Sequence, residues 1–581
     1  MLRNRVVLLA FLSVIIFASC NKVPEHAKYI PKNAMIVVGL NTKELSKKLA
    51  WDVLMGSKLL EEMKTKSPDN TQAAQGLGDA GIDVLNTTFF YFSPAASQEG
   101  YNYITAVVPL DDSKKWETYI QKNFSGATVK EVKDRKEALL EEDLYASWNK
   151  DIAIVRKAFI NSKNNQEQLL DYSEGDSAFT APDLNTIDPK PDPARLSTDM
   201  AAAFTLQKDN DITTDKRFTG LQKDGNDISF WMNYEVFMNN MNATSQGFMG
   251  GLALGNSIWK DAGYAAGINL DKGKVHAAVK YYLSKDLMDV YSKIGNKDFD
   301  KEMMDRLPSQ NLNMIAGINI SPEGTKALLE KMGMLGFVSL ALMQSDLTAD
   351  DIFQSFTGDI VMSLSDFSVQ AKTDTAASLN GGGYMDNKET NMSFIFALKI
   401  KDKVRFNKLL AYAKGQNGLS AVDATTYQLA GSKDMIISID KGFVVFANKT
   451  ALAKGYVNGD YQSQSKPDIV KKEIYGHPTG VFVDIQSFLN GATSDNASEQ
   501  EKELLALSKT VFKDLIINGG ENKKELFTFS GTLNLVNKDE NSLLQLLDYS
   551  YRISEINKKY DHREKPDDMP VAQGSDTTMT N

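Results

Sequence analysis

The chain has 581 residues, of which 42% are hydrophobic and 24% are charged, and its net charge is −10 at pH 7. This length exceeds one ordinary hydrophobic core, because domains cluster near ~100–200 residues, and the composition is that of a globular protein. The acidic balance argues against nucleic acid as a partner, since phosphate binding needs clustered lysine and arginine.

The first twenty residues carry the most specific signal in the chain. Arg3 and Arg5 precede an apolar stretch over residues 6–17, and two small residues then precede Cys20, the one cysteine. The stretch is shorter than the ~20 residues of a transmembrane helix and fits the central region of a secretory signal. A cysteine in this setting resembles the lipobox of bacterial lipoproteins, where cleavage precedes the cysteine and acyl chains such as palmitate are attached to it.

We therefore predict a lipoprotein signal peptide at residues 1–19, lipid attachment at Cys20 and a lipidated tether over residues 20–28. Several acyl chains on one residue anchor a protein stably, so a membrane is the first expected partner. Asn21 stands where an aspartate would favour the inner membrane. This favours the outer membrane of a cell envelope and leaves its periplasmic and surface faces both open. The alternative is a plain signal peptide followed by a chance cysteine.

Four strand-then-helix patterns occur twice in the same order. Residues 36–41 match 314–319, residues 103–116 match 394–406, residues 148–154 match 439–445, and residues 230–237 match 481–488. Both series then end in alternating segments that predict strands, at 264–270 and 274–282 in the first series and at 515–518 and 526–535 in the second. The period is far longer than that of solenoid repeats, so the pattern indicates a duplicated domain.

We predict an α+β fold made of two tandem copies of a mostly antiparallel sheet domain with packed helices. The first copy is expected at residues 29–300 and the second at residues 305–560, with the separation near residues 301–308. Residues 561–581 are expected to form a disordered tail that begins near Lys558, because this end is charged, polar and without periodicity.

Both series carry a polar residue where a strand hands over to a helix. These residues are Asn41, Asp111 and Asn233 in the first series and Asn319, Asp402 and Asp484 in the second. Such side chains accept hydrogen bonds from the free amides of a helix's first turn, so we interpret them as N-caps. Ser321-Pro322 has the same character. A duplicated catalytic carboxylate is the remote alternative.

Two apolar stretches rich in glycine and methionine lie at residues 248–254 and 332–343. The simpler interpretation is a helix packed closely in the core. The other is a deformable lining for an apolar ligand, since methionine fills irregular gaps and adapts to its surroundings.

Familiar catalytic patterns are missing from the sequence. Of the four histidines, we expect His26 in the tether and His562 in the tail to be unfixed, while His276 lies in a strand pattern and His477 in a loop. Neither of the latter two is accompanied by a Gly-x-Ser-x-Gly elbow, and no zinc-binding spacing occurs. A phosphate-loop-like stretch has Asn256 where the working lysine belongs. We predict no cofactor and no metal site, and the question of enzymatic activity stays open with the balance against it.

The segment at residues 29–38 (Tyr-Ile-Pro-Lys-Asn-Ala-Met-Ile-Val-Val), followed by Asn41 and Leu45, resembles the start of large Bacteroidetes lipoproteins. These are grouped as a domain of unknown function, the 4836 family. The resemblance covers nearly the whole mature chain and implies an envelope lipoprotein with no assigned reaction. The lipidated Cys20 is the only functional residue that it carries over.

Three functions fit these patterns. The first is non-catalytic binding or scaffolding with an envelope protein as partner. The second is a carrier for an apolar or glycan ligand in a cleft between the two copies. The third is a hydrolase without a catalytic histidine that uses paired carboxylates ~5–10 Å apart.

Overall fold

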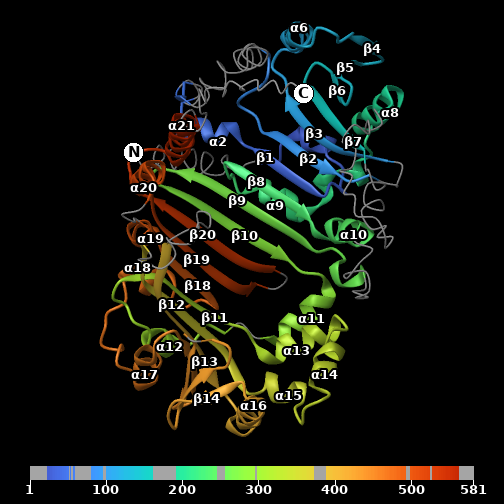
Figure 1. Cartoon of the computed structure of the whole chain (residues 1–581). Helices are drawn as coiled ribbons and strands as arrows, with labels where there is room; N and C mark the ends of the chain where they lie inside the picture. Colours follow the sequence, from blue (N-terminus) through green and yellow to red (C-terminus); the bar gives the residue numbers. More distant parts are fainter. Residues whose placement is uncertain are drawn as a thin grey trace, which may run out of the picture.

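The computed structural model describes residues 22–50, 53, 56–58, 80–95, 100–160, 191–244, 256–294, 297–371, 388–432, 434–492, 497–523 and 526–561. Cys20, the predicted signal peptide and the apolar stretch at 248–254 lie outside these residues. The fold is mixed α+β (Figure 1). None of the helices in the described ranges combines the length and the apolar character that crossing a membrane requires.

The strands of the described ranges are all antiparallel and belong to one continuous sheet. In chain order they are β1 (Ile36–Leu40), β2 (Thr88–Ser93), β3 (Tyr101–Pro109), β4 (Lys130–Val132), β5 (Arg135–Glu141), β6 (Leu144–Trp148), β7 (Ile152–Ile160), β8 (Ile228–Asn233), β9 (Gly263–Asp271), β10 (Lys274–Tyr282), β11 (Leu312–Asn319), β12 (Phe356–Ala371), β13 (Lys388–Ile400), β14 (Leu419–Ala421), β15 (Thr426–Leu429), β16 (Ile436–Asp440), β17 (Phe443–Ala447), β18 (Thr479–Asp484), β19 (Phe512–Lys523) and β20 (Leu526–Leu535).

The pairings give two series of strands that meet in the middle of the sheet. The first series has the order β4-β5-β6-β7-β3-β2-β1-β8-β9-β10. The second has the order β14-β15-β16-β17-β13-β12-β11-β18-β19-β20. Strands β10 and β20 pair over their whole length and join the series. Among the described strands, the two edges are therefore β4 and β14, each three residues long.

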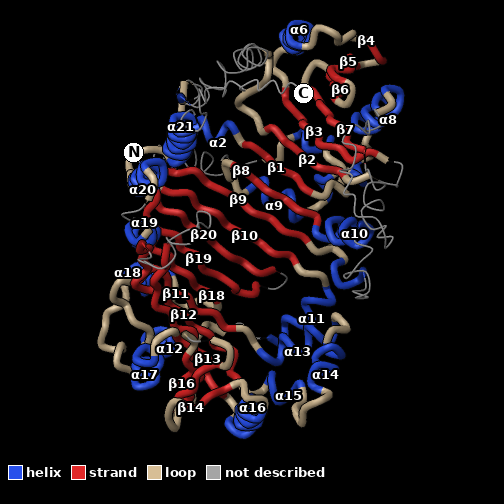
Figure 2. The backbone as a smooth tube through the Cα atoms, in the orientation of Figure 1, coloured by secondary structure: helices blue, strands red, loops and turns tan. Residues whose placement is uncertain are grey.

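Helices lie on both faces of the sheet and at the ends of its central strands (Figure 2). The α-helices are α2 (Thr42–Lys48), α6 (Ser113–Asn123), α8 (Pro193–Phe204), α9 (Lys216–Lys223), α10 (Tyr234–Thr244), α11 (Lys285–Ile294), α12 (Lys301–Asp305), α13 (Pro322–Lys331), α14 (Leu335–Leu342), α15 (Ala349–Phe353), α16 (Lys403–Gly415), α17 (Thr450–Asn458), α18 (Asp468–Glu473), α19 (Ile485–Gly491), α20 (Glu499–Val511) and α21 (Ser542–Asp561). The short 3-10 helices are η1 (Glu25–Tyr29), η2 (Lys208–Asn210), η3 (Ile212–Thr214) and η4 (Asn256–Trp259).

Two main hydrophobic cores lie on the same face of the sheet, which we call the packed face. Paired antiparallel residues share a face, so the registers assign each strand residue to one side. In the first series Val37, Trp231 and Ala265 form a paired row that is buried by η1, η3 and α9. In the second series the row Ile315-Phe482-Ile516 is buried by α12, α17 and α18.

The segment that we predicted as a tether is partly inside the first core, so that prediction is wrong from Glu25 onward. Residues 25–29 form η1, and Ala27 is fully buried. His26, which we expected to be unfixed, is buried as well, and its Nε2 atom is hydrogen-bonded to the carbonyl of Thr87. These small and aromatic side chains occupy space above β2. Their burial is decided by contacts with residues that are distant in the sequence.

Two other boundaries also differ from the prediction. Met303 and Met304 are fully buried in the second core, and Phe299 packs beside them, so residues 301–308 contain core rather than a separator. Helix α21 continues to Asp561, so the stretch from Lys558 to Asp561, which we predicted as tail, is helical. The remaining tail residues, with His562, lie outside the described ranges.

Most of the predicted N-caps are confirmed. Asn41, Asp402 and Asp484 accept hydrogen bonds from first-turn amides of α2, α16 and α19, and Asn233 accepts one from Val236 in α10. Ser321 caps α13 with proline at its first position.

Two of the cap predictions are wrong. The cap of α6 is Asp112 rather than Asp111. Asn319 is no cap, because its amide donates to the buried Asp359 carboxylate at 2.7 Å and so ties β11 to β12.

Candidate apolar binding trough

The six central strands β8, β9, β10, β20, β19 and β18 carry a second apolar face, opposite the packed face. Its residues alternate with those of the opposite face, and most of them are half-buried, whereas Ala266, Leu270 and Leu535 are buried. Rows of direct partners cross the junction of the two series, such as Ala266-Val279-Phe529 and Ala277-Gly531-Ile517-Val481. None of the trough-face positions in these six strands holds an aspartate or a glutamate. We call this face the trough.

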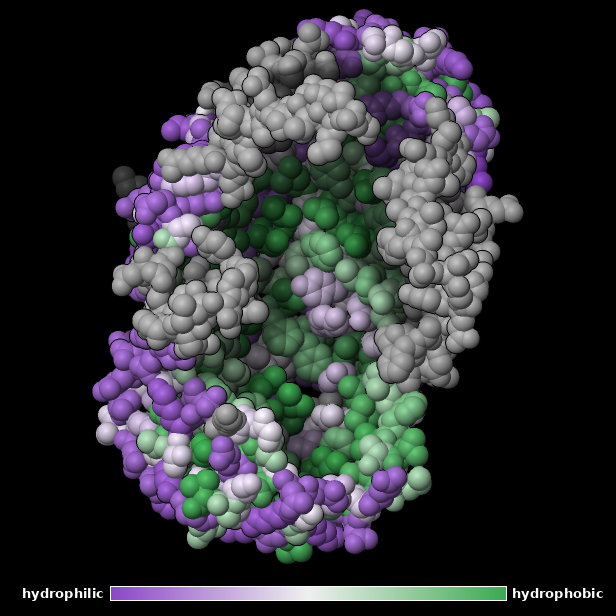
Figure 3. All heavy atoms as spheres, in the orientation of Figure 1, coloured by the Kyte–Doolittle hydropathy of each residue, from purple (hydrophilic) through white to green (hydrophobic). Residues whose placement is uncertain are grey.

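Figure 3 shows that the molecule is hollowed over these strands and that hydrophobic residues line the hollow. Hydrophilic residues gather instead on the rims and the outer surface. Neighbouring strands lie about 4.8 Å apart, so six strands give a floor about 24 Å across. One acyl chain spans about half of a bilayer's ~30 Å hydrocarbon core, and the trough is therefore large enough for an extended chain.

An aromatic row crosses one end of the trough. Phe230 of β8 contacts Tyr264 of β9 with ring centroids 5.8 Å apart, and Tyr264 contacts Tyr281 of β10 edge to face at 5.3 Å. Tyr234 of α10 closes the row at 6.2 Å from Tyr281. Rings locked in this way are rigid apolar surfaces that lose little conformational freedom when a ligand packs on them.

Helix α11 forms a wall of the trough next to this row. Its Tyr291 packs on Phe527 of β20, with ring centroids 5.0 Å apart. Burial raises the pKa of the Tyr264, Tyr281 and Tyr291 hydroxyls above the ordinary value. These tyrosines are therefore neutral at physiological pH, and the trough floor carries no charge from them.

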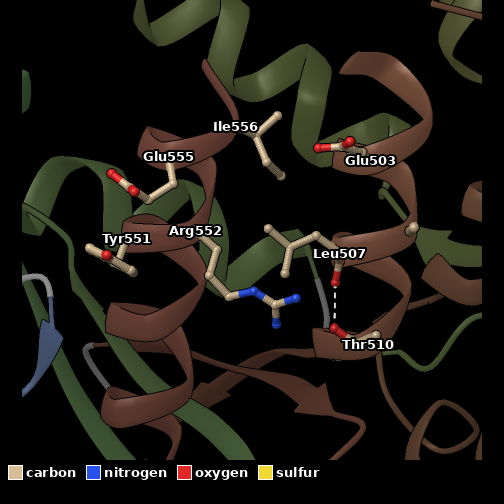
Figure 4. Close-up of a pocket in the computed structure, with 8 residues that line it drawn as sticks. Glu503, Leu507, Thr510, Tyr551, Arg552, Glu555 and Ile556 are labelled. Carbon is tan, nitrogen blue, oxygen red and sulfur yellow. Dashed lines mark hydrogen bonds between the residues drawn. The ribbon is translucent and has the colours of Figure 1, made fainter. Parts of the chain in front are cut away.

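A smaller cavity of about 540 Å³ lies between α20 and α21 (Figure 4). Arg552 extends from α21 toward Leu507 and Thr510 of α20. The two carboxylates that line this cavity are paired with lysines. Glu503 pairs with Lys559, and Glu555 lies 2.7 Å from Lys558. This arrangement is typical of a solvated helix pair rather than of a general acid and base.

A third cavity, of about 670 Å³, lies between β5, β6 and α8. Its buried Glu137 carboxylate accepts hydrogen bonds from Ser197 at 2.8 Å and from Arg135 at 3.3 Å. Burial raises the pKa of the neighbouring Tyr145 to about 12. The charge of the Glu137 carboxylate is balanced by Arg135, and Ser197 adds a hydrogen bond, as a buried charge requires.

The three histidines that the structure describes have different hydrogen-bond partners and form no common site. His276 lies in β10 with Nδ1 3.0 Å from the Thr532 hydroxyl, and Nδ1 of His477 lies 2.5 Å from Glu521. Within the described ranges, no group of three or more histidine, cysteine or acidic side chains is placed to hold a metal ion. Most of the phosphate-loop-like stretch lies outside the described residues. Its Asn256 is described and is the first residue of η4.

Sequence reasoning missed the trough although its signal is present in β10. The order Lys-Val-His-Ala-Ala-Val-Lys-Tyr-Tyr puts Val275, Ala277, Val279 and Tyr281 on one face. Alternation shows which residues share a face, but it does not show whether helices cover that face. The natural assumption that the apolar face is core is wrong for these strands.

Comparison with known proteins identifies no family. No protein-family model matches the chain, and no curated protein matches it. Among solved structures, crystal forms III and IV of TP0453 are similar to part of the chain, at 7% and 6% identity. Each alignment covers 48% of this chain, and they cover 89% and 88% of TP0453, with TM-scores of 0.23 and 0.24. At such TM-scores the likeness carries no argument about fold or function.

Proposed function

We propose that this protein is a membrane-anchored envelope lipoprotein that carries the acyl chain of a lipid in the trough. One observation carries the proposal: the central strands keep an apolar face that is largely half-exposed, while the other face of β8, β9, β18 and β19 is packed under helices of the two series. Apolar surface that stays in contact with water costs free energy, so a face of this size marks a binding site. The carrier needs no catalytic group and no cofactor.

An acyl chain fits the trough better than a glycan does. Sugars are recognised through several hydrogen-bonding side chains, whereas the trough floor offers mainly Val279, Phe529, Ile517 and their apolar neighbours. Paired carboxylates for hydrolysis have no place on this floor, because its strand positions hold no acid. Scaffolding of an envelope protein remains compatible with the fold, but no observation specifically favours it.

Domain duplication explains why the trough has two related halves. In support, β1 lies between β2 and β8 just as β11 lies between β12 and β18, and the remaining strands follow in the same order. A single ancestral unit would leave β10 as an unpaired edge. Pairing with β20 of a second unit covers that edge and doubles the width of the apolar floor.

The proposed anchor is lipid on Cys20, and the proposed location is the outer membrane of a cell envelope. The argument rests on the leader sequence described above and on the resemblance of residues 29–38 to the 4836 family. An anchored carrier would stay close to the membranes from which it takes and to which it gives its ligand.

The experiment compares two alanines that are neighbours in β10 and point to opposite faces. Ala277 lies on the trough floor, and Ala278 is exposed on the other face. With a fluorescent fatty acid such as cis-parinaric acid, we expect Ala277→Glu to weaken binding at least tenfold, because the carboxylate would be desolvated against the chain. Ala278→Glu should bind like the parent. Equal effects of the two variants, or no binding by the parent, would exclude the trough as the ligand site.

A further inference from the structure

Helix α14 leaves an apolar surface open to solvent. None of its residues is buried, and Phe337, Leu340 and the adjacent Met343 are 56%, 61% and 73% exposed. Residues 332–344 contain no charged side chain. Our expectation of a helix packed in the core over residues 332–343 is therefore wrong, because neighbouring helices cover too little of its surface.

An apolar helix of this kind is unusual on a water-soluble surface. Surface helices normally carry polar residues on the side away from the core, and a helix that is apolar all round is normally buried in protein or in lipid. Single exposed apolar residues such as Val404, 72% exposed on α16, are common and need no explanation. Three within about two turns of an uncharged segment form a patch that requires a partner.

The patch is continuous with the wall of the trough. Helix α14 packs on α13, α13 packs on α11, and Tyr291 of α11 lies on the trough residue Phe527. In Figure 3 hydrophobic surface extends from the hollow to its lower right, where Figure 1 places α13 and α14. An acyl chain leaving the trough along this wall would stay in contact with apolar side chains.

We infer that α14 inserts its apolar side chains into one leaflet of a phospholipid bilayer and is the place where the acyl chain enters and leaves. This inference rests on the proposed carrier function. The helix has eight residues and is about 12 Å long, so it cannot cross a hydrocarbon core of ~30 Å and must lie at its surface.

Charge identifies the kind of membrane. Lys331, just before the patch, is paired with Asp286 at 3.6 Å, and Lys326 is paired with Asp350. The patch is thus uncharged, and its cationic neighbours are already neutralised. A neutral patch gains nothing from anionic headgroups. Its contact with zwitterionic phosphatidylcholine should therefore be as strong as its contact with anionic lipid, and it should not weaken with salt. A protein partner would need polar contacts to fix its register, which the patch does not offer.

The first test places a fluorophore on the patch. The sequence has one cysteine, Cys20. The full chain carrying Leu340→Cys is labelled with an environment-sensitive dye and reconstituted into phosphatidylcholine vesicles, and the parent measures labelling at any unmodified Cys20. We expect a blue-shifted emission that is quenched by nitroxides on the acyl chains and unchanged between 0.1 and 1 M salt. Val404→Cys is the matched control, and its label should report water.

Water-like emission from position 340 on vesicles would overturn the inference. So would the same blue shift without vesicles that grows with protein concentration, because it would identify a second copy as the occupant. The second test uses the double variant Phe337→Glu/Leu340→Glu loaded with cis-parinaric acid. Binding should equal that of the parent, and transfer to phosphatidylcholine vesicles should slow at least tenfold.

Unchanged transfer by this variant would also overturn the inference while leaving the carrier function intact. Loss of binding in the parent itself would instead refute the carrier function. The label test would then still decide membrane contact, because its readout does not depend on a bound acyl chain.

Discussion

Ala278 of β10 and Ser530 of β20 are direct partners at the centre of the pairing that joins the two series. Lys274 and Leu526 are the first residues of β10 and β20, so the two partners lie equally far from the starts of their strands. Lys274 pairs with Asn534 at one end and Tyr282 with Leu526 at the other, which gives the ladder a local two-fold arrangement. A self-complementary contact of this kind arises naturally when two copies of one unit meet.

Adding a methyl group to Gly39 should destabilise the protein. A Cβ atom there would lie 2.5 Å from Oγ of Ser229 and 2.9 Å from the ring of Phe89, and both residues are buried. We expect Gly39→Ala to lower the free energy of unfolding by about 1–3 kcal/mol through overpacking, measured from the urea midpoint. Gly317→Ala should have an effect of the same order, because a Cβ atom there would lie 2.8 Å from both the end of Met304 and the buried ring of Phe299.

Gly220 provides the control for this pair. It lies in α9, and a Cβ atom there would meet no atom within 4 Å. We expect Gly220→Ala to raise stability by about 0.5–1 kcal/mol, because alanine restricts the unfolded chain and favours helix. Similar midpoints for all three variants would contradict the role of close packing at Gly39.

His26 should make the protein sensitive to acid. Burial lowers its pKa below the ordinary value of 6.5 and outweighs the hydrogen bond with the Thr87 carbonyl. At a pH between the folded and unfolded pKa values, His26 is therefore neutral in the folded protein and protonated in the unfolded chain. This contribution to stability is complete above pH 6.5 and is lost as the pH falls through the folded pKa.

The measurement is the thermal midpoint of the parent and of His26→Gln between pH 7.5 and 5. The variant loses a packing contact at every pH, so its midpoint should be lower throughout. Its slope with pH should nevertheless be flatter than that of the parent. Parallel profiles would mean that His26 does not titrate with unfolding.

Asn541 should hold α21 against the first series. Its side-chain Nδ2 atom donates to the backbone carbonyl of Leu270 at 2.9 Å. Its side-chain Oδ1 atom accepts from the backbone amide of Leu543 at the start of α21. Asn541→Ala leaves a buried carbonyl unpaired, so we expect a loss of about 1–3 kcal/mol. Hydrogen exchange of α21 amides should accelerate. The exposed Asn537→Ala serves as the control, and equal exchange in the two variants would exclude this tie.

Cys20→Ser tests the proposed anchor. Cells grown with an alkyne-bearing palmitate should label the parent and leave the variant unlabelled, because serine offers no thiol for the thioether. The parent should fractionate with outer membranes in a form lacking residues 1–19. A labelled variant, or an unlabelled parent that keeps its leader, would contradict the assignment.

Strand positions were predictable where alternation was regular. Residues 274–282 and 526–535 were expected as strands and form β10 and β20 with these bounds. Period-two alternation reports local geometry, and nothing in the tertiary structure opposed it there. The caps at Asn41 and Asp402 were predictable for the same reason, because a cap involves only neighbours in the chain.

Burial was not predictable in the same way. His26 belongs to the core because of Thr87, a residue 61 positions away. The apolar stretch that contains α14 has the composition of a core helix, yet it lies on the surface. Hydrophobicity shows that a segment favours burial, whereas the arrangement of the other elements decides whether it is buried. The trough escaped prediction for this reason.

The sheet ends, within the described chain, in two strands of only three residues, β4 and β14. Exposed backbone amides on a long edge strand would recruit strands from other molecules and start fibrils. Every longer described strand has partners on both sides over at least part of its length, so most strand residues of this protein offer no free edge as a template for amyloid growth. Such protection matters most for molecules crowded together on one surface.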